Sequence, residues 1–113
     1  MRPVKGIWCH ELDLYICGTA IRLTQGEMQI FTKLLSNPER IFSREMLYHA
    51  RTGQARHKPD GNIRTINGFI KKIRQKIKVP TGFTKIIGAE YGMGYYLNRR
   101  WYEVELNKRK AGQ

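Results

Sequence analysis

Residues 62–78 constrain the fold more than any other part of the chain. At about 100° per residue, the four isoleucines Ile66, Ile70, Ile73 and Ile77 fall within a sector of about 60° and predict the core-facing stripe of one helix. The same stretch carries six basic residues and no acidic one. A helix that stabilises its own surface mixes signs, so that Glu pairs with Lys one turn away. This helix therefore indicates either a polyanionic partner or the solvated face of a basic protein.

The charge of the whole chain favours a polyanionic partner. The 113 residues contain 21 Lys+Arg and 9 Asp+Glu, which gives a formal net charge of +12. The second half, residues 59–113, holds twelve basic and four acidic side chains and so carries +8 of that charge. A charge of this size attracts nucleic acid and opposes compaction. With 41% hydrophobic residues, the chain is still expected to fold as one small domain.

Several classes of protein are disfavoured. The apolar runs are too short to cross a bilayer, and the first residues lack the apolar stretch of a signal peptide, so we expect a cytoplasmic protein with no membrane contact. Two cysteines, Cys9 and Cys17, cannot form a disulfide framework and are expected to be buried thiols. The Cys and His spacing fits no zinc pattern, and no phosphate loop, nucleophile elbow or HExxH motif is present. We expect no metal, no cofactor and no enzymatic activity.

The first half of the chain predicts short strands followed by two helices. Residues 12–16 and 20–23 are strand candidates, and Trp8 belongs to an earlier strand. Residues 24–27, Thr-Gln-Gly-Glu, match a capping box, and the helix that follows is expected to end at residues 37–38, Asn-Pro. Ser43 is expected to cap a second helix that runs to about residue 50.

The second half predicts a loop, the basic helix and a hairpin. Residues 51–61 have no apolar period, and Pro80 is expected to stop the helix at about residue 78. Residues 83–87 and 95–97 are strand-like and are joined by a glycine-rich tip. Alternating apolar residues predict an edge strand at 101–106, followed by a loose basic end at 107–113. The basic residues of this tail are also candidates for an extra phosphate clamp.

Four motifs occur in a familiar order: Leu23–Glu27, Asn37–Leu47, Arg64–Ile77 and Gly92–Tyr95. Together they resemble the winged helix-turn-helix effector domain of OmpR/PhoB-type response regulators, over residues 12–97. The resemblance implies an α+β domain at 1–97 with an N-terminal antiparallel sheet, three helices and a C-terminal β-hairpin wing, and it leaves 98–113 as an extension. It also implies double-stranded DNA as the partner, with the third helix in the major groove and the wing at the adjacent minor groove.

The resemblance also assigns roles to individual positions, and it aligns Lys72 and Arg74 with groove-facing basic residues. We expect bases to be read by Asn67, Lys71, Lys72, Arg74 and Gln75, and phosphates to be held by Arg64, Thr65, Lys76, Lys78 and Lys85. The wing would present Tyr91 and Met93. The loop that contacts RNA polymerase in this family would present Arg51, Arg56, His57 and Lys58.

The sequence departs from the family pattern at several positions. Asn67, Gly68 and Phe69 stand where the family typically has Asp, Val and His, and Tyr91 stands where the wing typically has Arg. Gly68 lies on the outward face of the helix, where it either lets the backbone approach the groove floor or reflects drift.

Two functions are compatible with these features. The leading hypothesis is a sequence-specific DNA-binding transcriptional regulator without a receiver domain, bacterial or phage-encoded, associated with the nucleoid and acting as a homodimer on tandem repeats. The alternative is an interaction module that binds RNA polymerase, a sigma factor or a host regulator. It is favoured by the unusual loop, by Tyr91 in the wing and by the tail.

Overall fold

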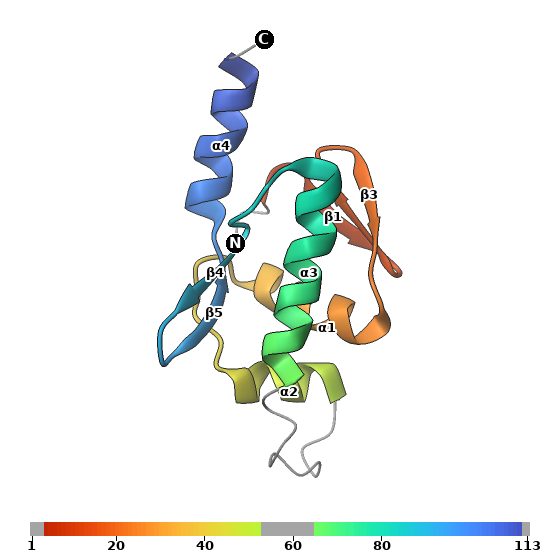
Figure 1. Ribbon diagram of the computed structural model, residues 1–113, viewed down its shortest axis with the longest axis vertical. Coiled ribbons are helices and arrows are strands. Elements are labelled where there is room, and N and C mark those ends of the chain that lie inside the picture. The colour runs from red at the N-terminus through yellow and green to blue at the C-terminus, as the bar shows by residue number, and fades with distance from the viewer. Residues whose placement is uncertain (1–3, 53–64, 112–113) are drawn as a thin grey trace.

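The computed structural model describes residues 4–52 and 65–111 as a sheet, three helices, a hairpin and a further helix. Figure 1 shows α3 in front, with the N-terminal sheet to its right and the hairpin to its left. The elements, in chain order, are β1 (Ile7–His10), β2 (Asp13–Ile16), β3 (Thr19–Arg22), α1 (Gln25–Ser36), α2 (Arg44–Thr52), α3 (Thr65–Thr81), β4 (Ile87–Glu90), β5 (Gly94–Leu97) and α4 (Arg99–Ala111). The predicted α+β winged helix is confirmed.

The N-terminal sheet is an antiparallel meander in the order β1-β2-β3. Its strands alternate between two faces, so that Leu14, Ile16 and Ile21 are buried against the helices. On the other face Trp8 stacks on its cross-strand partner Tyr15, with ring centroids 4.0 Å apart. The strands predicted from the sequence are therefore confirmed, including the early strand that contains Trp8.

Capping groups fix the starts of α1 and α2 as the sequence predicts. The Glu27 amide donates to the Thr24 hydroxyl at 3.3 Å, and the Thr24 amide donates to the Glu27 carboxylate at 2.8 Å, which completes the capping box. The Met46 amide donates to the hydroxyl of Ser43 at 3.1 Å. Each cap satisfies an amide of the first turn that has no partner within the helix, and so fixes the residue at which the helix begins.

Helix α3 buries its isoleucine stripe, as predicted, but ends later than expected. Ile66, Ile70, Ile73 and Ile77 are each at most 1% exposed. The helix continues through Pro80 to Thr81, although proline has no amide to donate to the carbonyl four residues earlier. The last turn is closed by Gly82, whose φ of +78° lets its amide donate to the Lys78 carbonyl at 2.8 Å. The predicted start of this helix at residue 62 lies outside the described residues.

The hairpin is shorter than predicted at its first strand. Pairing starts at Ile87, which lies opposite Leu97, so residues 83–86 are not a strand. Phe83 and Ile86 are both buried, a spacing of three that does not alternate between the faces of a sheet. The ladder cannot extend further because, after the Asn98 amide donates to the Ile86 carbonyl, the chain turns into α4. An isolated bridge joins Tyr95 of β5 to Phe42 on the other side.

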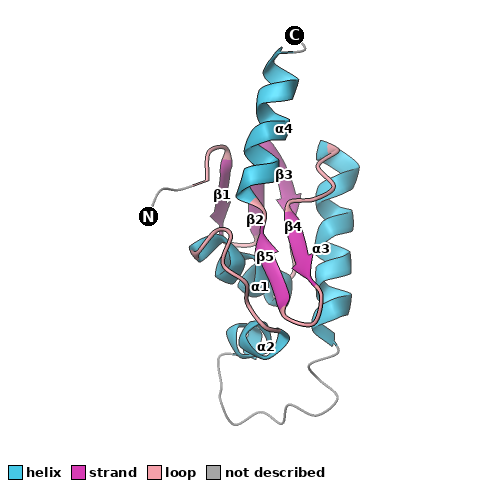
Figure 2. Cartoon of the chain, turned by 90° about the vertical axis from the view of Figure 1, so that its left-hand side faces the viewer, coloured by secondary structure: helices cyan, strands magenta, loops and turns pink. Residues whose placement is uncertain are grey.

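The C-terminal extension is a helix, so the strand predicted at 101–106 is wrong, as is the loose end predicted from 107 onward for the described residues 107–111. The Trp101 amide donates to the side chain of Asn98, which begins α4 as an N-cap. Tyr102 and Leu106 lie one helical turn apart on the inner face, while Val104, which the strand would have buried, is 55% exposed. α4 runs to Ala111, and residues 112–113 lie outside the described range. Figure 2 shows its C-terminal end projecting above the rest of the domain.

The thiols also differ from expectation. Cys9 is half-buried, and burial raises the pKa of its thiol. Cys17 is exposed in the turn between β2 and β3, where its φ is +51°, so the expectation that both thiols are buried is wrong for Cys17. A tight two-residue turn leaves its side chain outside the core.

Two features are absent from the described residues. Within residues 4–52 and 65–111, no three His, Cys, Asp or Glu side chains gather as a metal site would require. Over the same ranges, no helix has the length and apolar character needed to cross a membrane.

Candidate nucleic-acid interface

The outward face of α3 is a row of exposed polar and basic side chains. The row consists of Lys71, Lys72, Gln75 and Lys78. In the part of the chain that the structure describes, the side chains of these four residues form no hydrogen bond or ion pair. Because the isoleucine stripe fixes the opposite side of the helix in the core, this face is held rigidly toward solvent. It offers three ammonium groups and one amide to a ligand.

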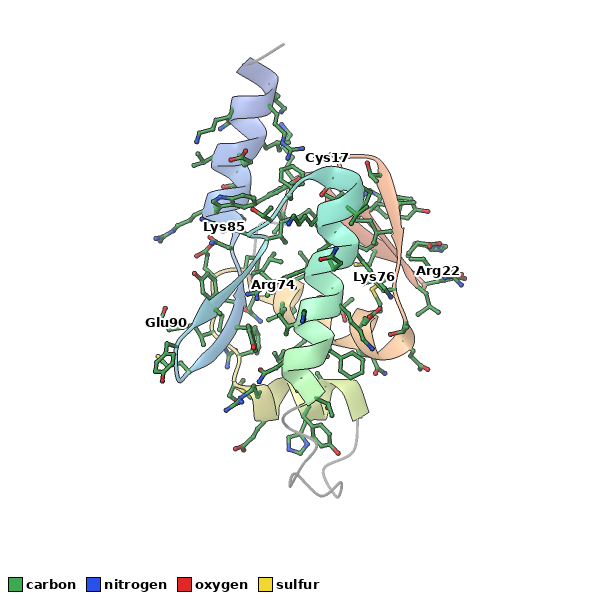
Figure 3. The ribbon with its side chains drawn as sticks, viewed as in Figure 1. Cys17, Arg22, Arg74, Lys76, Lys85 and Glu90 are labelled. Carbon is green, nitrogen blue, oxygen red and sulfur yellow. The ribbon has the colours of Figure 1, made fainter. Side chains whose placement is uncertain are left out.

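Arg74 does not belong to that row, because it is tied to the wing. Its Nε and Nη2 donate to the carbonyl oxygen of Ile87 in β4 at 3.2 and 2.9 Å. The guanidinium also lies 5.7 Å from the ring centre of Tyr95 in β5. Figure 3 shows Arg74 on the side of α3 that faces the hairpin. This residue, expected from the sequence to read a base, therefore links α3 to the wing.

Tyr95 completes this link with a second residue expected to read a base. Its hydroxyl donates to Asn67 Oδ1 at 2.6 Å, although Asn67 itself is exposed. Its backbone forms two hydrogen bonds with Phe42. The Phe42 amide donates to the Tyr95 carbonyl at 2.8 Å, and the Tyr95 amide donates to the Phe42 carbonyl at 2.9 Å. Gly94 must be a glycine here, because its φ is +148° and a Cβ would overlap the Phe42 carbonyl. The sequence placed Tyr95 in a predicted strand and at the end of the Gly92–Tyr95 motif, but it gave no sign of these contacts.

Lys76 is held on the opposite side of α3 by a buried carboxylate. Its Nζ lies 2.6 Å from Glu27 Oε1, and Glu27 is only 1% exposed. Burial acts to raise the pKa of Glu27, but the hydrogen bonds from Lys76 and from the Thr24 amide outweigh it, and the pKa is lowered. Figure 3 shows Lys76 and Arg74 on different sides of the helix. The structure thus places the ammonium group of Lys76, which the sequence predicted to hold a phosphate, against Glu27 of α1.

The wing tip presents two large exposed side chains. Tyr91 is 100% exposed and Met93 is 59% exposed. Gly92, with a φ of +75°, forms the turn between them, and the Met93 amide donates to the Glu90 carbonyl at 3.0 Å. Between this tip and the start of α2 lies an open groove of about 630 Å³, which is lined by Ser43, Arg44, Glu45, Asn67 and residues 89–95.

The remaining residues expected from the sequence are dispersed. Lys85 is exposed on the segment between α3 and β4 (Figure 3), and Thr65 is the first residue of α3. Arg64, Arg56, His57 and Lys58 lie outside the described residues, as does the side chain of Arg51. The loop expected to contact polymerase therefore has no structural description here.

These elements define a winged helix protein: an N-terminal sheet, three helices with an exposed basic third helix, and a two-stranded wing. Residues 18–97 match the family described as transcriptional regulatory protein, C terminal. The chain belongs to this family, the OmpR/PhoB-type DNA-binding domains of transcription regulators. Fold and family are those of transcription regulators rather than of enzymes.

Similar proteins agree with that assignment. The TorCAD operon transcriptional regulatory protein TorR of Escherichia coli K12 is 29% identical over 80 residues, which cover 71% of this chain and 32% of TorR. The transcriptional regulatory protein BaeR of Escherichia coli O6:H1 is 33% identical over 84 residues, which cover 74% of this chain and 32% of BaeR. The chain thus matches about a third of the length of these relatives.

The same fold occurs in the DNA-binding domain of the response regulator AdeR, whose structure was solved in complex with an intercistronic region. That domain aligns with a TM-score of 0.70 and 24% identity, over 83% of this chain and 94% of the other.

Proposed function

We propose that this chain is a sequence-specific double-stranded DNA-binding regulator of transcription, with α3 in the major groove and the wing at the adjacent minor groove. The observation that carries the proposal is the exposed row of α3, which is defined above and has no partner among the described residues. A helix of this diameter fits the major groove of B-DNA, where lysine and amide side chains meet base edges.

The structure supports different roles for different residues of this interface: base reading, phosphate binding and positioning of the wing. The first three residues of the exposed row are proposed to read bases: Lys71, Lys72 and Gln75. Lys78 and Lys85, exposed at the end of α3 and after it, are proposed to hold phosphates together with Thr65 and Arg64. Asn67 and Arg74 would act as positioning residues that set the angle between α3 and the wing.

The wing is proposed to contact the minor groove through Tyr91 and Met93. Both side chains are large and exposed at a hairpin tip, and apolar side chains at such tips can enter the minor groove or pack on sugars.

Selection from a pool of random duplexes at near-physiological salt, with non-specific competitor present, tests the proposal. An enriched motif is expected, and two half-sites in direct repeat would support tandem binding by a homodimer. If no sequence is enriched over several rounds, the operator-specific proposal is wrong. The chain would then be tested against RNA polymerase, sigma factors and host regulators as a protein-interaction module.

Lys72→Ala tests the proposed base-reading role. We expect a loss of about 1–3 kcal/mol of binding free energy and relaxed preference at a single base position. Lys33→Ala, at an exposed position of α1, is the matched control and should keep the preference unchanged. Uniform weakening over all sequences would instead assign Lys72 to a phosphate.

A further inference from the structure

Helix α4 lies outside the residues that match the family, and its first half is built into the domain. The match ends at residue 97, whereas α4 spans Arg99–Ala111. Tyr102 is 1% exposed, and its hydroxyl donates to the Lys5 carbonyl at 2.7 Å. The rings of Trp101 and Tyr102 contact Phe83 edge to face, with centroids 6.1 and 5.2 Å away. These contacts fix the direction in which the rest of the helix extends.

Arg109 anchors the helix again, two turns further along. Its Nη1 donates to the Thr81 carbonyl at 2.7 Å, and its guanidinium lies 3.8 Å from the ring centre of Phe83. The arginine therefore ties α4 to the C-terminal end of α3, the helix of the proposed interface. Because α4 is held at both Tyr102 and Arg109, its last turn has a defined position relative to α3.

The last turns of α4 present cations and stand clear of the domain. Residues 107–110 are all exposed, and among them Lys108, Arg109 and Lys110 are basic with no acidic residue in that turn. Figures 1 and 2 show this end of α4 projecting beyond the end of α3, along the longest axis of the molecule, which measures 50 Å against 28 and 27 Å. Cations in the last turn of a helix interact favourably with the helix dipole, which accounts for part of this pattern.

Helix stabilisation does not account for a further lysine at the same place. Lys5, from the N-terminal segment, lies against Lys110, and contact between the two lysines lowers the pKa of Lys110. Neither Lys108 nor Lys110 forms an ion pair with a carboxylate in the described structure. Crowding of like charges is unfavourable unless an anion lies between them.

We propose that the last turns of α4, with Lys108 and Lys110 beside Lys5, form a second DNA contact that binds backbone phosphates flanking the segment read by α3. The inference rests on the proposed function and adds a surface outside the family match. At 1.5 Å per residue, the 13 residues of α4 extend about 20 Å, and the C-terminal end of that length projects beyond the rest of the domain (Figures 1 and 2).

The chemistry of this surface favours DNA over a protein partner. Protein interfaces have aromatic or aliphatic anchors at their centre, whereas residues 107–110 offer one amide and the ammonium groups of Lys108 and Lys110. Phosphate contacts need only positive charge and donors, and they carry no sequence information. The surface is therefore expected to add affinity without changing the preferred sequence.

The salt dependence of binding tests the inference on a 30-base-pair duplex of arbitrary sequence. Lys108→Gln/Lys110→Gln is compared with Arg22→Gln/Lys33→Gln, which removes the same two charges from exposed positions of β3 and α1. Each lost phosphate contact lowers the slope of log K against log salt by about 0.9. For the α4 variant, the slope should therefore be smaller in magnitude by about 1.8. The ratio of the wild-type to the variant binding constant should fall by roughly tenfold between 50 and 200 mM salt. The control should keep the wild-type slope.

The outcomes separate this inference from the proposed function. If both double variants show the same slope, the second contact does not exist, even when the wild type selects a clear motif. If the α4 variant alone loses slope while no motif is enriched, the contact exists and the sequence-specific function is wrong. A wild type that binds no duplex at 50 mM salt overturns both. Circular dichroism melting of each variant confirms that these exposed substitutions leave the fold intact.

Discussion

Replacing Lys76 with methionine is expected to destabilise the domain by leaving a buried carboxylate without its cation. Glu27 is 1% exposed, and removing one partner of a fully buried ion pair costs about 3–5 kcal/mol. Two features reduce that figure. The side chain of Lys76 is 36% exposed, so water replaces part of the interaction, and the Thr24 amide still donates to Glu27. We expect a loss of about 1–3 kcal/mol in the free energy of unfolding at pH 7.

The loss should depend on pH, because it depends on the charge of Glu27. In the wild type the pKa of Glu27 is lowered, so the ion pair stabilises the fold above the ordinary carboxyl pKa and is lost as the pH falls through the lowered value. In Lys76→Met, burial acts with less opposition and raises the pKa of Glu27 toward or above its ordinary value. The difference from wild type should therefore shrink as the pH falls toward 3, because Glu27 becomes protonated in the wild type as well as in the variant.

Urea denaturation at pH 7 and pH 3 measures both quantities, with Lys78→Met as the matched control on the same helix. Lys78 is exposed, so the control should change stability by less than about 0.5 kcal/mol at either pH. The two variants should exchange roles in DNA binding. Lys78→Met should reduce the magnitude of the slope of log K against log salt by about 0.9, and Lys76→Met should leave that slope unchanged. An equal loss of stability at both pH values refutes the ion-pair argument. A lowered slope in Lys76→Met would restore the phosphate contact predicted from the sequence.

Three further predictions concern α3, the wing and α4. A Cβ at Gly68 would meet nothing within 4 Å, so Gly68→Ala should stabilise the domain by about 0.8–1 kcal/mol in thermal melts. A simultaneous loss of DNA affinity would show that the backbone approaches the groove floor there, and unchanged affinity would exclude that approach. Arg74→Lys removes the paired donors to the Ile87 carbonyl, so hydrogen exchange at the wing amides should accelerate. The slope of log K for DNA binding against log salt should stay constant, and a reduced slope would place Arg74 on a phosphate. Tyr102→Phe leaves the Lys5 carbonyl without its hydroxyl donor and should cost about 1 kcal/mol in urea denaturation, whereas no change would mean that water replaces the hydroxyl.

The elements that the sequence predicted well are those with a local signal. The capping box at Thr24 and the Ser43 cap are satisfied within three residues, so their residue types alone indicate where the helices begin. The stripe of isoleucines fixed the buried side of α3 by its period. The alternation of apolar residues at 101–106 was misleading, because over six residues the strand and helix periods overlap and the Asn98 cap was the deciding signal.

What the sequence by itself determined is the order of the elements, the buried face of α3 and the basic character of its other face. The tertiary structure decided which of those basic side chains are available to a ligand. Lys76 meets a carboxylate 49 residues away, and Arg74 meets a carbonyl 13 residues away. Hydrophobic period reports only which side of a helix is covered, whereas the partner of a long cationic side chain depends on the elements that fold against it.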